Sequence, residues 1–423
     1  MTLLRPLLGT EKKYVLLAQI LEFTGNFIFF KLLATLVKKE VMGDYLIATS
    51  ALSFFLITSF SVLDQGFLRI ASTLGNDKQV RTNFSACLII YAAISCLWAI
   101  CILVISPLVN HTETAITPIS LALIALVFLE PLKISSNTLL NSRRERKLTA
   151  LTKLIEIIVK LSLLVLTVTG RSLSSASVLL ILAASSVASS SFSIYHQRRY
   201  LGFVNKQIAV DIFRQLTAFS WPLLIWGVFG WMQQMLNRLF LDFYQDSLEV
   251  ANYGVISSIS SYPFTLVLSV IAAYSLPIIY QKADHDFQSA YMQVSQTIKA
   301  TIPAIAIILL LLTILQKPII LLAASGEYLD YSWLLPLCAL GNALIALGTV
   351  MSYTNFAANN TKLLILPNIL PGVLSLLFGI LLIPSFGIHG AITNSLIAST
   401  SFLSFHAYAY LRTKRTRVIT IKQ

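Results

Sequence analysis

Residues 26–50 read NFIFFKLLATLVKKEVMGDYLIATS, and residues 235–258 read MLNRLFLDFYQDSLEVANYGVISS. Each segment carries one basic residue in an apolar run, and a tyrosine follows it: Tyr45 lies fourteen positions after Lys31, and Tyr253 fifteen after Arg238. A Glu-Val pair precedes each tyrosine, at 40–41 and at 249–250. Shared charged and polar positions are stronger evidence of a repeat than shared apolar ones. The two segments therefore predict an internal duplication, with a parallel copy in each half of the chain.

The composition places both copies in a lipid bilayer. Of the 423 residues, 56% are hydrophobic and only 12% are charged, and the mean hydropathy is +0.78. Soluble domains have about 25% charged residues. The deficit excludes a soluble enzyme, a disordered chain and a coiled coil. The net charge of +13 is then a signal of membrane orientation, and no nucleic-acid partner is expected.

Twelve apolar stretches are long enough to cross the hydrocarbon core, which takes about 20 residues per helix. They run near 14–36, 42–67, 83–106, 115–139, 148–169, 174–196, 215–241, 250–280, 290–315, 332–356, 362–383 and 387–411. We therefore predict an all-α integral membrane protein with twelve transmembrane helices in two pseudo-symmetric six-helix lobes. Residues 1–210 form the first lobe with a basic amphipathic linker, and residues 211–423 form the second lobe with a basic tail.

The Lys and Arg residues between the spans predict the orientation. When the connections are assigned alternately to two sides, one side holds 21 of these residues and the other holds four: Lys38, Lys39, Arg171 and Lys317. Because basic residues concentrate in cytoplasmic connections, both termini are expected in the cytoplasm. The basic and apolar stretch near 197–214 is expected to lie along the membrane surface, with anionic membrane lipids as its partners.

Ionisable residues inside the spans are the candidates for function, since a charge in hydrocarbon must pair, face water or reach an interface. Glu156 and Lys160 are spaced to pair on one helix face, as are Glu130 and Lys133. Positive charge is then left over, and for three lysines we expect snorkelling to the inner interface. These three are Lys133, Lys153 and Lys299. For Lys31 and Arg238 two interpretations stay open: contact with an anionic ligand, or snorkelling to the outer interface.

The sequence lacks the motifs of several common catalytic and metal-binding sites. The chain contains no GxxxxGK[ST] loop for a nucleotide, its five His residues are scattered, and its four Cys residues lack the spacing of a zinc site. No catalytic residue, metal or cofactor is therefore expected. The serine-rich run at 172–193 favours close packing of helices.

The segments GNFIFFKLLATLVKKEVMGDYLIATSALSFF (25–55) and SWPLLIWGVFGWMQQMLNRLF (220–240), with Asp64, Gly66, Arg69 and Pro277, carry a family resemblance. Together with the twelve spans in two halves, they resemble the Wzx-type flippases of O-antigen or capsule repeat units. These belong to the polysaccharide-exporter branch of the multidrug/oligosaccharidyl-lipid/polysaccharide (MOP) superfamily, which also contains the MATE transporters. The resemblance covers nearly the whole chain and is a pattern of helices more than a sharp motif.

The resemblance implies a flippase that moves an undecaprenyl-pyrophosphate-linked oligosaccharide from the cytoplasmic to the periplasmic leaflet of the bacterial inner membrane. Two lobes would alternate access to a central cavity, and a polysaccharide polymerase and a chain-length regulator are the implied protein partners. The residues expected to bind the substrate are Lys31, Arg238, Lys160, Gln234, Asn237, Asn26 and Arg69. The carboxylates expected to serve ion coupling are Glu22, Asp64, Glu130 and Glu156, and for Glu130 and Glu156 a purely ion-pairing role is the preferred alternative.

Three other functions are weighed against this one. An ion-coupled multidrug antiporter of the same superfamily is expected to carry acidic cavity residues, whereas basic residues outnumber acidic ones by six to three among the nine charged residues singled out in the spans. These nine are Glu22, Lys31, Glu130, Lys133, Lys153, Glu156, Lys160, Arg238 and Lys299. A membrane-embedded polysaccharide polymerase or ligase usually has a large external loop, and no connection here exceeds about 20 residues. A scaffold without transport has no use for costly charges inside the membrane.

Overall fold

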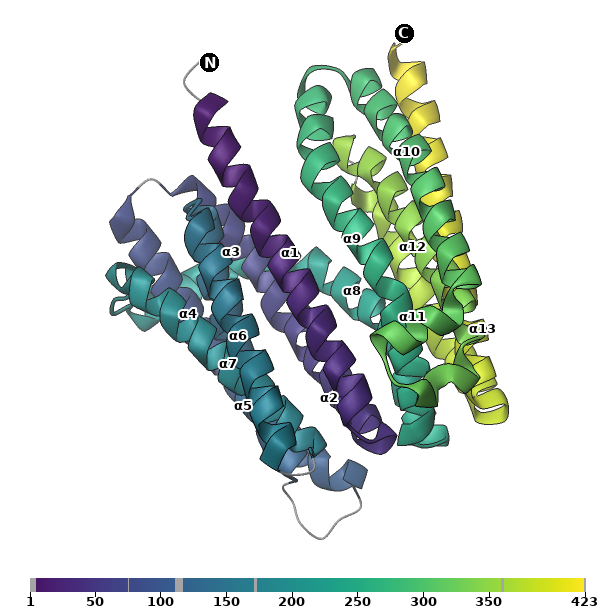
Figure 1. Cartoon of the computed structure of the whole chain (residues 1–423). Helices are drawn as coiled ribbons and strands as arrows, with labels where there is room; N and C mark the ends of the chain where they lie inside the picture. The colour runs from purple at the N-terminus through teal and green to yellow at the C-terminus, as the bar shows by residue number, and fades with distance from the viewer. Residues whose placement is uncertain (1–4, 75, 111–116, 171–172, 359–360, 422–423) are drawn as a thin grey trace. The chain divides into compact units, whose positions relative to one another are not determined.

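The computed structural model describes residues 5–74, 76–110, 117–170, 173–358 and 361–421, and over these residues the chain is helical with short connections and no strand (Figure 1). It divides into two compact units, Met1–Gly227 (unit 1) and Val228–Gln423 (unit 2). The helices of unit 1 are α1 (Arg5–Leu36), α2 (Lys39–Phe55), η2 (Leu56–Ser61), α3 (Val62–Thr73), α4 (Asp77–Asn110), α5 (Pro118–Ser142), α6 (Arg146–Gly170), α7 (Ser175–Gln197) and η3 (Arg198–Tyr200).

The boundary between the units falls inside α8 (Lys206–Tyr244), whereas the sequence predicts a lobe boundary at 210–211. The remaining helices are α9 (Ser247–His285), α10 (Phe287–Ile314), α11 (Gln316–Ala323), η4 (Gly326–Tyr331), α12 (Leu334–Ala357), η5 (Thr361–Leu364) and α13 (Ile365–Ile421). The two parts of α8, Lys206–Trp221 and Leu223–Tyr244, meet at a 55° bend. Pro222 lies at this bend and lacks the amide hydrogen that a straight helix needs.

Nine helical segments of the described chain are long and apolar enough to cross a membrane, and α8 makes ten if its bent parts form one span. The other two predicted spans are also helical. Helix α6 is 25 residues long but carries Lys153, Glu156 and Lys160 in its apolar run. Helix α13 contains two predicted spans, which are separated where Gly387 adopts φ 50° and ψ −127°. The fold is therefore that of a multi-pass helical membrane protein, as predicted.

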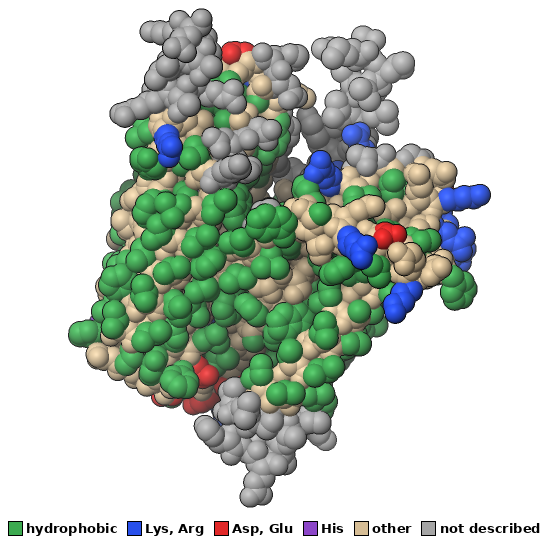
Figure 2. All heavy atoms as spheres, turned by 180° about the vertical axis from the view of Figure 1, so that it is seen from behind, with side chains coloured by type: hydrophobic (Ala, Val, Ile, Leu, Met, Phe, Trp, Pro, Cys, Tyr) green, Lys and Arg blue, Asp and Glu red, His purple; other side chains and the backbone are tan. Residues whose placement is uncertain are grey.

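The surface of the helices is as apolar as a bilayer requires. Leu97, Leu166 and Leu381 lie within helices and remain 64–65% exposed. Figure 2 shows broad areas of hydrophobic side chains on one face of the molecule, with the Lys and Arg side chains toward the upper and right parts of the view. Soluble proteins seldom expose apolar patches of this extent, so these side chains are placed to contact acyl chains.

Each unit is organised around one helix that contacts several others, α5 in unit 1 and α12 in unit 2. In unit 1, α5 packs against α3, α4 and α7, and α1 packs against α6; in unit 2, α12 packs against α9, α10 and α13. The core of unit 1 contains the buried rings of Phe60, Phe67 and Phe84.

The two copies of the repeated sequence occupy corresponding places in these units. The first copy contains the turn between α1 and α2, and the second contains the turn between α8 and α9. Lys31 lies five residues before the end of α1, and Arg238 lies six residues before the end of α8. Tyr45 and Tyr253 each lie six residues after the start of the next helix.

Candidate functional site: an ionic network in unit 1 and an arginine-lined cavity in unit 2

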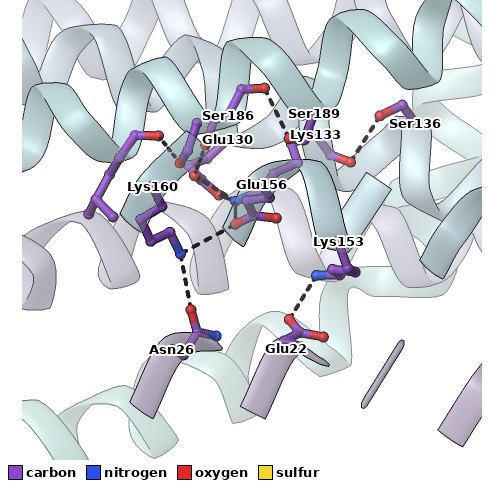
Figure 3. A network of polar contacts seen from close by, with 12 residues as sticks. Glu22, Asn26, Glu130, Lys133, Ser136, Lys153, Glu156, Lys160, Ser186 and Ser189 are labelled. Carbon is purple, nitrogen blue, oxygen red and sulfur yellow. Dashed lines mark hydrogen bonds and ion pairs between the residues drawn. The ribbon is translucent and has the colours of Figure 1, made fainter. Parts of the chain in front are cut away.

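The first candidate site is a network of charged side chains inside unit 1 (Figure 3). At its centre, the Nζ atom of Lys133 on α5 lies 2.8 Å from both carboxylate oxygens of Glu130 and 3.0 Å from Oε1 of Glu156 on α6. These three side chains are only 10–14% exposed. Glu130 and Lys133 share a face of α5 because they are three residues apart, and this face meets α6.

The network extends from α6 to α1. One turn after Glu156, the Nζ atom of Lys160 lies 3.6 Å from Oε1 of that residue and donates a hydrogen bond of 3.0 Å to Oδ1 of Asn26. One turn earlier on α1, Oε1 of Glu22 accepts a hydrogen bond of 2.7 Å from Lys153 (Figure 3). Two polar contacts therefore hold α1 against α6, along with the packing of their apolar side chains.

Charge is balanced in this network, and this changes the interpretation of the sequence. The expectation that Lys133 snorkels to the interface is wrong, since its ammonium group is enclosed by two buried carboxylates, and Lys153 forms a short ion pair with Glu22. The sequence also suggested surplus positive charge around Lys160, whereas three carboxylates accompany the three ammonium groups. The members are Glu22, Glu130, Glu156, Lys133, Lys153 and Lys160. Of the nine charged residues singled out in the spans, Lys31, Arg238 and Lys299 lie outside the network.

Serines of α7 contribute more than close packing. The hydroxyl of Ser186 donates to Oε1 of Glu130, and Ser193 shares a hydrogen bond of 3.1 Å with Thr152 of α6. Near the other end of α7, Ser175 donates to Asp44 of α2 at 3.2 Å. These roles were not predicted from the sequence. The spacing of seven residues between Ser186 and Ser193, which places both on one helix face, is the signal that points to them.

Asp64 is buried in unit 1 but lies apart from the network. Its side chain on α3 accepts hydrogen bonds from the hydroxyl of Thr138 on α5 and, at 3.5 Å, from that of Tyr91 on α4. The residue is 8% exposed. No ion pair to Asp64 occurs among the residues that the structure describes.

The second candidate site is a polar cavity of about 110 Å³ within unit 2, where Arg238 of α8 faces α9, α12 and α13. The guanidinium donates a hydrogen bond of 3.0 Å to the hydroxyl of Ser258. A buried water needs roughly 10–15 Å³ of such space, so the cavity has room for several waters or a small anionic group. Other polar residues in its lining are Gln233, Gln234, Ser257, Ser261, Asn342 and Ser395.

Asn237, adjacent to Arg238, points to a different neighbourhood. Its amide nitrogen donates to the hydroxyl of Tyr253 and to the carbonyl of Ala391, each at 3.1 Å, and its Oδ1 accepts a hydrogen bond of 2.6 Å from Asn394. With 1% exposure, Asn237 joins α8 to α9 and α13 and does not line the cavity. Of the three polar residues predicted to bind substrate on α8, the structure brings Gln234 and Arg238 together and places Asn237 in the core.

Two further predicted residues lie outside both sites. Arg69, near the end of α3, is exposed and stacks at 4.7 Å on the ring of Phe219. Lys31 is half-buried on α1, and no ion pair to it occurs within the described part of the chain. Among the described residues, no group of three or more His, Cys, Asp or Glu side chains is arranged to hold a metal ion.

Comparison with known protein families identifies the family of this chain. Residues 12–283 match the model of the family described as polysaccharide biosynthesis protein. The chain belongs to this family. No protein with curated function matches it.

Solved structures share the fold of this family member at low sequence identity. An inward-facing multidrug resistance MATE transporter of the MOP superfamily superposes with a TM-score of 0.73 at 13% identity, covering 94% of this chain and 96% of the other. The lipid II flippase MurJ, in an inward closed conformation, gives 0.72 at 14% identity, with coverage of 96% and 91%. The MATE transporter DinF-BH gives 0.68 at 14%, with coverage of 97% and 95%. The family member therefore has the fold of MOP-superfamily transporters and flippases.

Proposed function

We propose that this protein is a Wzx-type flippase for surface glycans. It would carry an undecaprenyl-pyrophosphate-linked oligosaccharide repeat unit from the cytoplasmic to the periplasmic leaflet of the bacterial inner membrane by alternating access. Membership of the polysaccharide biosynthesis protein family and a fold shared with a lipid II flippase support this assignment. Both termini would lie in the cytoplasm, and a polysaccharide polymerase and a chain-length regulator would be its partners.

The observation that carries the proposal is the chemistry of the Arg238 cavity. Arginine is the side chain best suited to a phosphate group because its guanidinium is permanently charged and donates in a planar fork. Hydroxyls and amides, such as those of Ser257, Gln234 and Asn342, suit the hydroxyl groups of a sugar. A cation-transporting cavity would instead be expected to present carboxylates, and none is in the lining of this cavity.

The balanced network in unit 1 changes which residues we assign to the pyrophosphate. Lys160 already contacts Glu156 and Asn26, so a phosphate would have to compete with a buried carboxylate for its charge. Lys31 is the basic residue of the repeat that corresponds to Arg238 and lies outside the network. We therefore assign phosphate binding to Arg238 in unit 2 and, separately, to Lys31 in unit 1, and a structural role in holding α1 on α6 to Lys160.

The test replaces Arg238 by Ala and by Lys in a strain that depends on this protein for display of its glycan. The Ala variant should abolish surface display and cause the lipid-linked repeat unit to accumulate in the cytoplasmic leaflet, while the Lys variant should retain part of the display because the charge remains. Display is measured by glycan-specific labelling of intact cells, and protein level by immunoblot. The matched control is Lys299→Ala, which removes an exposed basic residue of unit 2 outside the cavity.

Full display with Arg238→Ala at normal protein level would remove Arg238 from the mechanism. The second candidate function is a multidrug antiporter, because the MATE transporter superposes as well as the lipid II flippase does. Wild-type protein that lowers drug accumulation in cells but does not support glycan display would favour that candidate.

A further inference from the structure

The four carboxylates of unit 1 that the sequence offers for ion coupling fall into two classes. Glu130 and Glu156 each lie within 3.0 Å of the ammonium group of Lys133, and Glu22 lies 2.7 Å from that of Lys153. Asp64 is as deeply buried as Glu156, at 8% exposure each, but its hydrogen-bonding partners are two hydroxyl groups. Ion pairing explains why the three glutamates are tolerated inside the unit. It does not explain Asp64, which is buried without an ion pair among the described residues.

The described neighbours of Asp64 on the surrounding helices are neutral groups. Helix α4 contributes the phenol of Tyr91 and, one turn before it, the buried thiol of Cys87. Helix α5 contributes the hydroxyl of Thr138. On the side of α8, Ser220 and Leu216 approach Gly66, two residues beyond Asp64. The described residues of these helices place no Lys, Arg or His in an ion pair with Asp64.

A π-helical turn precedes Asp64. The segment η2 (Leu56–Ser61) joins α2 to α3 without a break, and the indole of Trp98 donates to the hydroxyl of Ser59 at 2.9 Å. A π-turn inserts one residue into the helix, which rotates the later residues by about 100° around the helix axis. With this rotation, the side chain of Asp64 faces the core of unit 1. Single π-turns are often found next to functional residues.

An ionised carboxylate in such a place is unfavourable, because burial removes most of its hydration and no cation among the described residues pairs with it. The same group with a proton is a neutral hydrogen-bonding partner for two hydroxyls. A bound metal cation is a poorer fit, since hard cations such as Ca²⁺ and Mg²⁺ take about six oxygen ligands, and the hydrogen-bonding partners of Asp64 among the described residues are two hydroxyl groups.

We propose that Asp64 is a proton-binding site, which holds a proton on its carboxyl group in this conformation and releases it in another conformation of the transport cycle. The binding of the proton is independent of the cargo. The coupling of that proton to transport rests on the proposed function. Glu22, Glu130 and Glu156 are thereby assigned to structure, and Asp64 alone among the four carboxylates to ion coupling.

The first test is infrared spectroscopy of the purified full-length protein in lipid. The wild type should show the carbonyl stretching band of a protonated carboxylic acid at neutral pH, and Asp64→Asn should lose it. The matched control is Asp44→Asn on the same span, where a half-buried carboxylate also accepts a hydrogen bond from a hydroxyl group. This variant should keep the band. A wild type without the band, or a band that survives in Asp64→Asn, would overturn the proposal.

Thr138→Val offers a second measurement that does not change the carboxyl group. Removal of a hydroxyl donor takes away a partner that stabilises the ionised form, so the band should persist to a higher pH than in the wild type. An unchanged pH midpoint would show that the band belongs to another group and would count against Asp64.

Glycan display separates this proposal from the proposed function. With a wild type that supports display, Asp64→Asn should lower it at least tenfold at equal protein level, and Asp44→Asn should leave it within twofold of the wild type. Equal display by Asp64→Asn and the wild type would refute the coupling role. If the wild type supports no display but the infrared result holds, the proton site stands and the glycan substrate is refuted.

Discussion

The surroundings of individual charged residues in this protein reflect the cost of removing a charge from water. A charged side chain is tolerated in hydrocarbon only if it pairs, reaches an interface or faces a wet cavity, and the described residues show the first and the third solution. Lys133 is enclosed by two carboxylates, whereas Arg238 faces a cavity lined by hydroxyl and amide groups. These two environments predict different responses to substitution: loss of stability for the first, and loss of transport for the second.

Replacement of Glu156 by Gln should destabilise the protein strongly. It removes the carboxylate that lies near both Lys133 and Lys160 and leaves buried ammonium groups without full compensation, which costs about 3–5 kcal/mol in buried pairs. The control is Glu22→Gln, whose side chain is 48% exposed; surface pairs contribute about 0–1 kcal/mol. The free energy of unfolding can be measured by titration with a denaturing detergent in bicelles. Equal losses for the two variants would show that burial does not set the strength of this network.

Helices were easier to predict than their contacts. Long apolar runs separated by polar turns predict every membrane-length segment, since span length depends on the bilayer. The π-turn at 56–61 has no comparable signal in its sequence, LITSFS. Contacts within one helix, such as the pair of Glu130 and Lys133, follow from spacing. The pair of Glu22 and Lys153 joins positions 131 residues apart, and only the packing of α1 on α6 brings them together.

Close approach of α8 and α13 provides a test at this scale. A Cβ atom added at Gly372 of α13 would lie 2.6 Å from the backbone oxygen of Phe229 on α8, so Gly372→Ala should push the helices apart. Overpacking of this kind costs about 1–3 kcal/mol. At Gly230 nothing lies within 4 Å of the added atom, and Gly230→Ala should be neutral or stabilising by up to about 1 kcal/mol. The measurement is thermal unfolding of both purified variants. A larger loss of stability for Gly230→Ala than for Gly372→Ala would contradict the packing of α8 on α13.

The whole molecule combines one duplicated plan with two different interiors. Both units place a basic residue of the repeat shortly before the same helix turn, yet among the described residues the ionic network lies in unit 1. Its counterpart in unit 2 would be sought in the first part of α13, and residues 365–411 contain no Asp, Glu, Lys or Arg. Amides fasten unit 2 instead, through Asn237 and Asn394. Divergence of this kind leaves an ionic core in one unit and a polar cavity in the other.

Parallel repeats make a prediction about sides of the membrane that does not depend on the cargo. Six of the predicted spans separate the α1–α2 turn from the α8–α9 turn, so both turns should lie outside the cytoplasm. In a background with all four native Cys residues replaced, single cysteines at the exposed positions Lys38 and Gln245 should react with a membrane-impermeant maleimide in cells whose outer membrane has been made permeable.

Cysteines at the exposed positions Lys206 and Gln288 serve as the controls for this experiment. They should react only after the inner membrane is also opened, because an odd number of spans separates each from the predicted outer turns and because basic residues hold their connections in the cytoplasm. Labelling of one predicted outer turn but not the other would mean an inverted repeat or a different number of spans. In that case Lys31 and Arg238 would lie near opposite sides of the membrane, and the equivalent phosphate-binding roles proposed for them would be refuted.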